Sequence, residues 1–259
     1  MSETVIEMMA ASVSARGPRE APVLDSVTWR VLTGDFWVVC GPPGSGKSDL
    51  LLTAAGLLRP TSGGHRLFGR NLADLSEDEI VRDRFRVGFV FGHDGRLFHD
   101  MTVSENVAFP LCYHRNCSVA EVRDRVASVI ESTGLLPHAS SRPGSLNRCV
   151  RLKVALARAL VLDPEVILLD EPLNGAGPRE TMWWLEFLTK LRGGGGLSAR
   201  PCVTVVVGAN NVQPWVEHGS QFALLHKCQF NVVGGRAEVS ERSGHLADEL
   251  YFGGLTGNS

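Results

Sequence analysis

A glycine-rich run that ends in lysine and serine is the part of the sequence that most directly indicates chemistry. Its residues follow the pattern G-x-x-x-x-G-K-[ST] and are Gly41, Pro42, Pro43, Gly44, Ser45, Gly46, Lys47 and Ser48. Glycines let backbone N–H groups converge on phosphate oxygens, and a helix that begins at the lysine adds its positive dipole end. In such a loop Lys47 is expected to reach the β and γ phosphates of a nucleotide, and Ser48 to bind Mg²⁺.

Two carboxylates that follow an apolar run predict the second half of the site. Asp170 and Glu171 come directly after Val166–Leu169, and Pro172 follows them. In an open α/β sheet, ligands bind at the carboxyl ends of the strands. Asp170 is therefore expected to hold Mg²⁺ through water, and Glu171 to orient and polarise an attacking water in the catalytic step. Acidic residues are common at strand ends, so this pair indicates a functional site only in combination with the phosphate loop.

Short apolar runs that alternate with helix-type segments must position these residues. The runs that predict strands are Phe36–Cys40, Val87–Phe91, Val166–Asp170 and Cys202–Val207, followed by a hairpin at Phe222–His226 and Phe230–Val233. Continuous apolar strands are typical of parallel sheets covered on both faces, so we expect an α/β fold. A helix is predicted at Lys47–Leu58, directly after the phosphate loop. This strand-loop-helix context argues against a chance glycine-rich turn.

Helical patterns fill the stretch between Phe91 and Pro164. Helices are predicted at Thr102–Ala108, Val119–Thr133 and Leu146–Leu162, with others at Arg179–Leu191 and Ala237–Tyr251. We interpret the stretch of about 92–163 as a helical lobe inserted in a core of about 1–91 and 164–259, the whole forming a single domain over 1–259. The basic residues Arg148, Arg151, Lys153 and Arg158 spread around their helix and are interpreted as a solvated face.

Charge and hydrophobicity exclude several classes of protein. The chain has 26 Lys and Arg against 28 Asp and Glu, a net charge of −2, which gives no electrostatic reason to bind nucleic acid. Its longest apolar runs are too short to span a bilayer, so any membrane contact is expected to go through a partner. The start of the sequence lacks the pattern of an export signal, which points to a reducing cytosol.

Cysteines and histidines offer weaker candidates. The cysteines Cys40, Cys112, Cys117, Cys149, Cys202 and Cys228 include no C-x-x-C pair, and packing is the preferred interpretation. The histidines His93, His99, His114 and His138 lack the spacing of metal ligands. Trp183 and Trp184 are expected to serve packing or a partner contact.

The phosphate loop, the Asp-Glu-Pro run and the helical segment before it together resemble the ATP-binding subunit of an ABC transporter over Val23–Asn211. The resemblance implies a phosphate-loop NTPase core with an antiparallel β element near the N-terminus, and ATP and Mg²⁺ as cofactors. It also implies a homodimer or heterodimer of such subunits that moves an integral-membrane permease, and hence a cytoplasmic protein peripheral on the inner face of the membrane. Leu97–Leu111 and Phe252–Gly254 are similar to the branch associated with MCE proteins and phospholipids, which implies lipid-related transport.

The same resemblance brings out departures from the family's pattern. Gly92 replaces a glutamine that links core and lobe, and Asn147, Arg148 and Cys149 replace the signature Ser-Gly-Gly. Gly177 replaces an aspartate, and Ala209 replaces the switch histidine. Arg16 lies where an aromatic side chain usually stacks on adenine. In the family that glutamine links core and lobe through a magnesium contact, and this contact is therefore expected to be lost. Arg148 is expected either to obstruct the γ-phosphate of the opposite subunit or to supply it with a guanidinium. Asn147 is suited to cap its helix.

Two functions of different classes remain open. The intact Lys47, Ser48, Asp170 and Glu171 favour an enzyme that hydrolyses ATP to energise transport. The departures favour a nucleotide-binding pseudo-ATPase with a structural or regulatory role in an ABC complex. A soluble ABC protein of DNA repair or translation is disfavoured, because the chain has one core, no long coiled coil and no basic excess.

Overall fold

The apolar runs form a central sheet in the computed structural model, which describes residues 3–14, 22–92, 94–195 and 200–241. Its strands are β3 Phe36–Cys40, β6 Val87–Val90, β7 Val166–Asp170, β8 Thr204–Ala209, β9 Gln221–His226 and β10 Gln229–Gly234. They lie in the order β10-β9-β3-β8-β7-β6, with every neighbouring pair parallel except the antiparallel hairpin of β9 and β10. The predicted mainly parallel sheet and C-terminal hairpin are confirmed.

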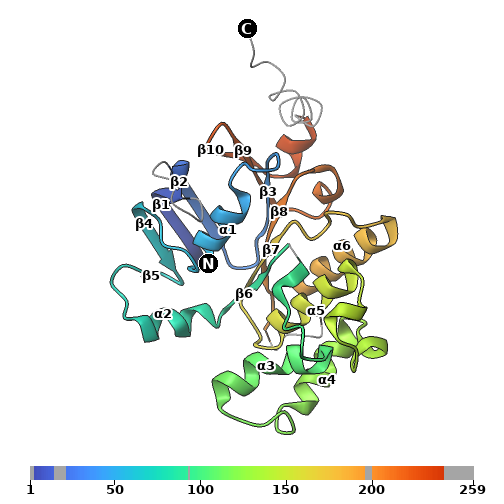
Figure 1. Cartoon of the computed structure of the whole chain (residues 1–259). Coiled ribbons are helices and arrows are strands. Elements are labelled where there is room, and N and C mark those ends of the chain that lie inside the picture. The colour runs from blue at the N-terminus through green and yellow to red at the C-terminus, as the bar shows by residue number, and fades with distance from the viewer. Residues whose placement is uncertain (1–2, 15–21, 93, 196–199, 242–259) are drawn as a thin grey trace.

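A smaller antiparallel sheet lies beside the central one. Its strands are β1 Thr4–Ser14, β2 Pro22–Leu32, β4 Ser62–Leu67 and β5 Arg70–Asn71, in the order β2-β1-β4-β5. Figure 1 shows this sheet in blue to teal on one side of the molecule. It is the antiparallel β element that the family resemblance implied.

The helices gather on two sides of the central sheet. They are α1 Lys47–Ala54, α2 Glu77–Arg84, α3 Val103–Arg115, α4 Arg123–Ser132, α5 Arg148–Leu160 and α6 Pro178–Arg192, with short 3-10 turns such as η1 Asp94–Arg96. Helices α3, α4 and α5 lie between β6 and β7 in the sequence and together form one end of the molecule (Figure 1). Among the described residues, no helix combines the length and the apolar character that crossing a bilayer requires.

The packing of its side chains explains why β3 is apolar throughout. Phe36 and Val38 pack in the core that the helices α3 to α6 share, whereas Trp37 and Val39 pack in a second core with α1 and the antiparallel sheet. Successive side chains of a strand point to opposite faces, so a strand covered on both faces has no polar position. This double burial fixes the strand ends that carry the site.

Several element ends differ from the prediction. Helix α1 ends at Ala54 rather than Leu58, because Gly56 turns the chain with a φ of +71°. Helix α4 begins at Arg123, since Ser118 and Glu121 close a turn before it with a 2.7 Å hydrogen bond. Residues 236–241 are helical, and the remainder of the predicted C-terminal helix lies outside the described residues. Cys40 is buried as expected for packing, whereas Cys228 is exposed between β9 and β10.

Candidate functional site

The phosphate loop connects β3 to α1 at the carboxyl end of the central sheet. Gly46 precedes the helix with a φ of +91°, and a Cβ there would lie 2.5 Å from Val23 Cγ1, so only glycine fits. Gly46 offers no side-chain cap to the first N–H groups of α1. The Ser45 Oγ atom is buried and makes no hydrogen bond within the described structure. Free N–H groups and an unpaired hydroxyl suit phosphate oxygens, so the loop fits a nucleotide.

Lys47 lies buried at the centre of the loop with 3% exposure. Its Nζ atom donates to the backbone oxygens of Gly41 at 2.8 Å and Pro42 at 2.9 Å. Glu171 Oε1 lies 3.3 Å from the same Nζ. Burial lowers the pKa of Lys47, and the Glu171 carboxylate acts in the opposite direction. An ammonium has three donors, and three acceptors surround this one.

The acidic pair lies where the sequence predicts, at the end of β7 and beside the loop. Glu171 has a φ of +50°, and its backbone N–H donates to Gly208 O of the neighbouring strand at 2.9 Å. Asn174 Nδ2 donates to Glu171 Oε2 at 3.0 Å. The carboxylate is therefore held from both sides, by Lys47 and by Asn174. Asn174 is a site residue that no sequence motif indicated.

A cavity of about 280 Å³ opens beside Glu171. Its lining includes Glu171, Asn174, Thr181, Gly208, Ala209, Asn210 and Trp215. The resemblance aligned Ala209 with the family's switch histidine. In the structure Ala209 lines this cavity, and its side chain is a single methyl group.

Gly92 lies against the end of β7 so closely that no other residue fits. A Cβ on Gly92 would lie 2.2 Å from Asp170 O. The glutamine that the resemblance leads one to expect at this position therefore has no room in this arrangement of the backbone. The segment after β6 lies close against the acidic pair.

Arg148 links the helices to the core within this same chain. Its Nη2 atom donates to Gly92 O at 2.8 Å, and its Nη1 atom donates to Asn174 O. The loss of the magnesium contact expected from Gly92 stays a prediction, and Arg148 supplies a different linkage between the helices and the core. The two roles expected for Arg148 toward the γ-phosphate of an opposite subunit stay predictions, and two of its donors already bind backbone oxygens of its own chain.

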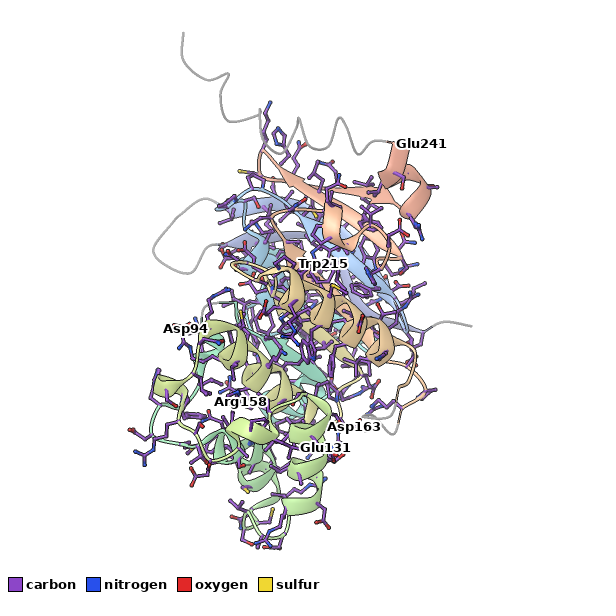
Figure 2. The ribbon with its side chains drawn as sticks, turned by 90° about the vertical axis from the view of Figure 1, so that its right-hand side faces the viewer. Asp94, Glu131, Arg158, Asp163, Trp215 and Glu241 are labelled. Atoms are coloured by element: carbon purple, nitrogen blue, oxygen red, sulfur yellow. The ribbon has the colours of Figure 1, made fainter. Side chains whose placement is uncertain are left out.

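The other basic residues of α5 also bind the chain rather than face solvent. Arg151 Nη2 lies 2.8 Å from Asp94 Oδ1, and Arg158 donates to the backbone oxygens of Gly95 and Arg96 at 2.7 and 2.9 Å. Figure 2 shows Asp94 and Arg158 together at the helical end of the molecule. Lys153 Nζ lies 3.8 Å from the ring centre of Trp183. The predicted solvated face is wrong, because these basic side chains are half-buried against Gly92, residues 94–96, Asn174 and Trp183.

Asn147 and Gly177 both begin helices. The side chain of Asn147 accepts a hydrogen bond from the N–H of Val150 at 2.9 Å, which confirms the predicted cap of α5. Gly177 precedes α6 and provides no side-chain cap. Arg16, His93 and Phe252–Gly254 lie outside the described residues.

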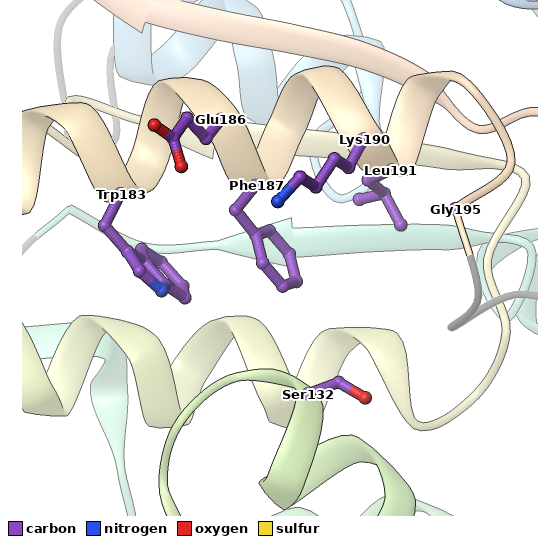
Figure 3. Close-up of a pocket in the computed structure, with 7 residues that line it drawn as sticks. All are labelled: Ser132, Trp183, Glu186, Phe187, Lys190, Leu191 and Gly195. Carbon is purple, nitrogen blue, oxygen red and sulfur yellow. The ribbon is translucent and has the colours of Figure 1, made fainter.

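A second cavity lies away from the phosphate loop, along α6 (Figure 3). It has a volume of about 310 Å³ and is lined by Ser132, Trp183, Glu186, Phe187, Lys190, Leu191 and Gly195. The rings of Trp183 and Phe187 stack with centres 4.8 Å apart. Trp184 is 1% exposed and packs in the core. Trp184 therefore packs as expected and Trp183 borders the cavity, while a partner contact stays a prediction.

Comparison with known proteins places this geometry among relatives. Residues 24–174 match the family model described as ABC transporter. The chain is 34% identical over 226 residues to the energy-coupling factor transporter ATP-binding protein EcfA2 of Symbiobacterium thermophilum. The aligned region covers 86% of this chain and 75% of that protein. It is 34% identical over 190 residues to the probable ribonucleotide transport ATP-binding protein mkl of Mycobacterium leprae, which covers 73% of this chain and 53% of that protein.

Solved structures give the same grouping. The ATP-binding cassette MJ0796, in a dimeric post-hydrolysis state bound to ADP and Pi, matches with a TM-score of 0.77 and 26% identity. The match covers 89% of this chain and 99% of that one. The chain spans about half the length of the mkl relative, whereas it spans nearly all of this cassette.

Proposed function

The chain belongs to the ABC transporter family, and from that premise we propose that it binds Mg-ATP and hydrolyses it to energise transport through a separate membrane permease. The observation that carries the proposal is the meeting of Lys47 and Glu171, whose Nζ and Oε1 atoms lie 3.3 Å apart. The lysine of the phosphate loop and the carboxylate that follows the apolar strand β7 thus share one site.

The chain's own residues divide the work of hydrolysis. The loop N–H groups and Lys47 hold the phosphates, and Ser48 and Asp170 hold the ion. Bound Mg²⁺ would neutralise charge on the phosphate oxygens. Glu171 orients the attacking water and accepts its proton. Because three acceptors already surround Lys47, phosphate must replace at least one of them, and Glu171 is the one whose side chain can move.

A row of aromatic side chains supports contact with a permease. Phe98 is 43% exposed and Tyr113 is 72% exposed. The ring of Phe109 is tilted against that of Phe98 at a centre distance of 4.7 Å and stacks on that of Tyr113 at 5.9 Å. Buried Asn106 fixes the chain below this row through bonds to Phe98 O and Met101 O at 3.0 and 3.1 Å. We propose that this row docks the permease and places the protein on the inner face of the membrane.

The cargo and the pairing of subunits are part of the same proposal. The resemblance of Leu97–Leu111 to the phospholipid-associated branch supports a lipid-related cargo. A dimer of ATP-binding subunits is supported by the dimeric cassette that matches this fold. Pull-down from solubilised membranes is expected to recover a polytopic protein, and Tyr113→Ala should weaken that recovery. Recovery of soluble partners alone would contradict the transport role.

A second candidate, a nucleotide-binding subunit with little or no turnover, is favoured by the cavity beside Glu171 that Ala209 leaves. Removal of one oriented donor lowers an enzymatic rate by about 10²–10³. Single-turnover hydrolysis and ATP affinity, measured on the chain alone and with its copurified permease, separate the candidates. Hydrolysis that Glu171→Gln abolishes supports the enzyme, whereas tight binding without turnover in either preparation supports the second candidate.

A further inference from the structure

Arg148 is the point at which the helical end of the molecule touches the catalytic end of its own core. It is the first residue of α5 and is half-buried. Its two terminal nitrogens reach segments far apart in the sequence, Gly92 after β6 and Asn174 after β7. A planar guanidinium can donate to two carbonyls in fixed directions, which a lysine ammonium on a flexible stem does less well.

The contact continues from Arg148 to the carboxylate through one residue. Asn174 accepts from Arg148 with its backbone oxygen and donates from its amide side chain to Glu171 Oε2 at 3.0 Å. Glu171 Oε1 in turn lies 3.3 Å from Lys47 Nζ. The orientation of Glu171 therefore depends on the position of Asn174, and the position of Asn174 depends on Arg148.

We propose that Arg148 is a positioning residue that joins the helices to the core and, through Asn174, sets the orientation of Glu171. The inference rests on the proposed function only for its effect on hydrolysis, because the contacts of Arg148 are with backbone oxygens of this chain. Residues Arg151 and Arg158 extend the same attachment to the segment 94–96. Of these three arginines, Arg148 is the one that reaches both Gly92 and the loop that carries Asn174.

Hydrogen exchange on the full chain without nucleotide tests the attachment. The N–H of Asn174 donates to Glu171 O at 3.1 Å and that of Ala176 to Leu173 O at 3.0 Å, so both amides are protected by local bonds. Loss of a hydrogen bond from a charged donor should raise their exchange rate about tenfold in Arg148→Ala, and less in Arg148→Lys. Arg123→Ala, which removes an exposed arginine from α4, is the control and should leave these rates unchanged. Equal rates in Arg148→Ala and the parent would overturn the proposal.

Single-turnover hydrolysis tests the effect on Glu171. Misplacing a reacting group lowers rate rather than weakening binding, so Arg148→Ala should hydrolyse ATP about tenfold or more slowly while binding ATP no more weakly than the parent. Asn174→Ala keeps the backbone oxygen that Arg148 binds but loses the side-chain amide that donates to Glu171. It should therefore slow hydrolysis without raising the hydrogen-exchange rate of the Ala176 N–H. A rate for Arg148→Ala equal to or above that of the parent would overturn the role toward Glu171. A parent that binds no ATP would refute the proposed function, while the exchange comparison would still decide the attachment.

Discussion

The Nζ atom of Lys47 and the Oε1 atom of Glu171 lie 3.3 Å apart, although they come from the phosphate loop and from the end of β7. Lys47 is almost wholly buried, and its remaining contacts are the backbone oxygens of Gly41 and Pro42. A buried cation is costly unless it is paired, so the carboxylate stabilises the charged form of the lysine. Phosphate and Glu171 therefore compete for the same ammonium.

Lys47→Ala should abolish measurable Mg-ATP binding. The substitution removes the charged donor that phosphate would contact, which corresponds to a loss of affinity of about a hundredfold or more. Titration with a fluorescent ATP analogue measures the effect. Lys190→Ala on α6 is the matched control, because it removes a lysine that lines the other cavity. An unchanged affinity in Lys47→Ala would refute the assignment of the phosphate loop.

Glu171→Gln should bind ATP at least as tightly as the parent and lose its turnover. The neutral amide no longer competes with phosphate for Lys47, which favours binding, and it cannot accept a proton from water. General-base catalysis contributes about 10²–10⁴ in rate, so the single-turnover rate should fall by that order. Hydrolysis at the parental rate would show that another group activates the water.

Gly92→Gln should destabilise the protein rather than restore the family's arrangement. Its Cβ would lie 2.2 Å from Asp170 O, so the backbone must shift. Overpacking of this kind costs about 1–3 kcal/mol, measurable by urea denaturation. Gly144→Ala is the control, because a Cβ on Gly144 meets nothing within 4 Å. Equal stability of Gly92→Gln and the parent would mean that the segment after β6 moves freely away from β7.

His65 should make the protein less stable as the pH falls. Its side chain on β4 is buried, and this burial lowers the pKa of His65 from 6.5 to about 4. Between those values the unfolded chain binds a proton that the folded chain does not, so the free energy of unfolding decreases with falling pH. The loss approaches about 3 kcal/mol by pH 4 at roughly 1.4 kcal/mol per pKa unit. Urea denaturation at several pH values between 7.5 and 5 gives the free energy of unfolding as a function of pH. This free energy should change less with pH in His65→Leu than in the parent, and an equal change in both would contradict this account.

The local patterns of the sequence were enough to predict the phosphate loop, the acidic pair and the strands that carry them. Gly41–Ser48 is a short run whose backbone geometry follows from its own glycines and from the adjoining strand and helix. The strand Val166–Asp170 is buried on both faces, so its apolar residues mark it without reference to its neighbours. Parallel strands then bring their carboxyl ends to one edge of the sheet, where the two motifs meet.

The partners of Arg148 were decided by the tertiary structure alone. Its bonds join residues 56 and 26 positions apart, and the sequence around α5 reads equally well as a basic face in water. A long charged side chain can be hydrated or can bind backbone oxygens, and only the placement of other segments against its helix selects between these. The close approach of Gly92 to Asp170 and the contact of Asn174 with Glu171 depend equally on how distant segments are placed against each other. Helical and strand periodicity specify which face of an element is buried, but not which polar groups meet there.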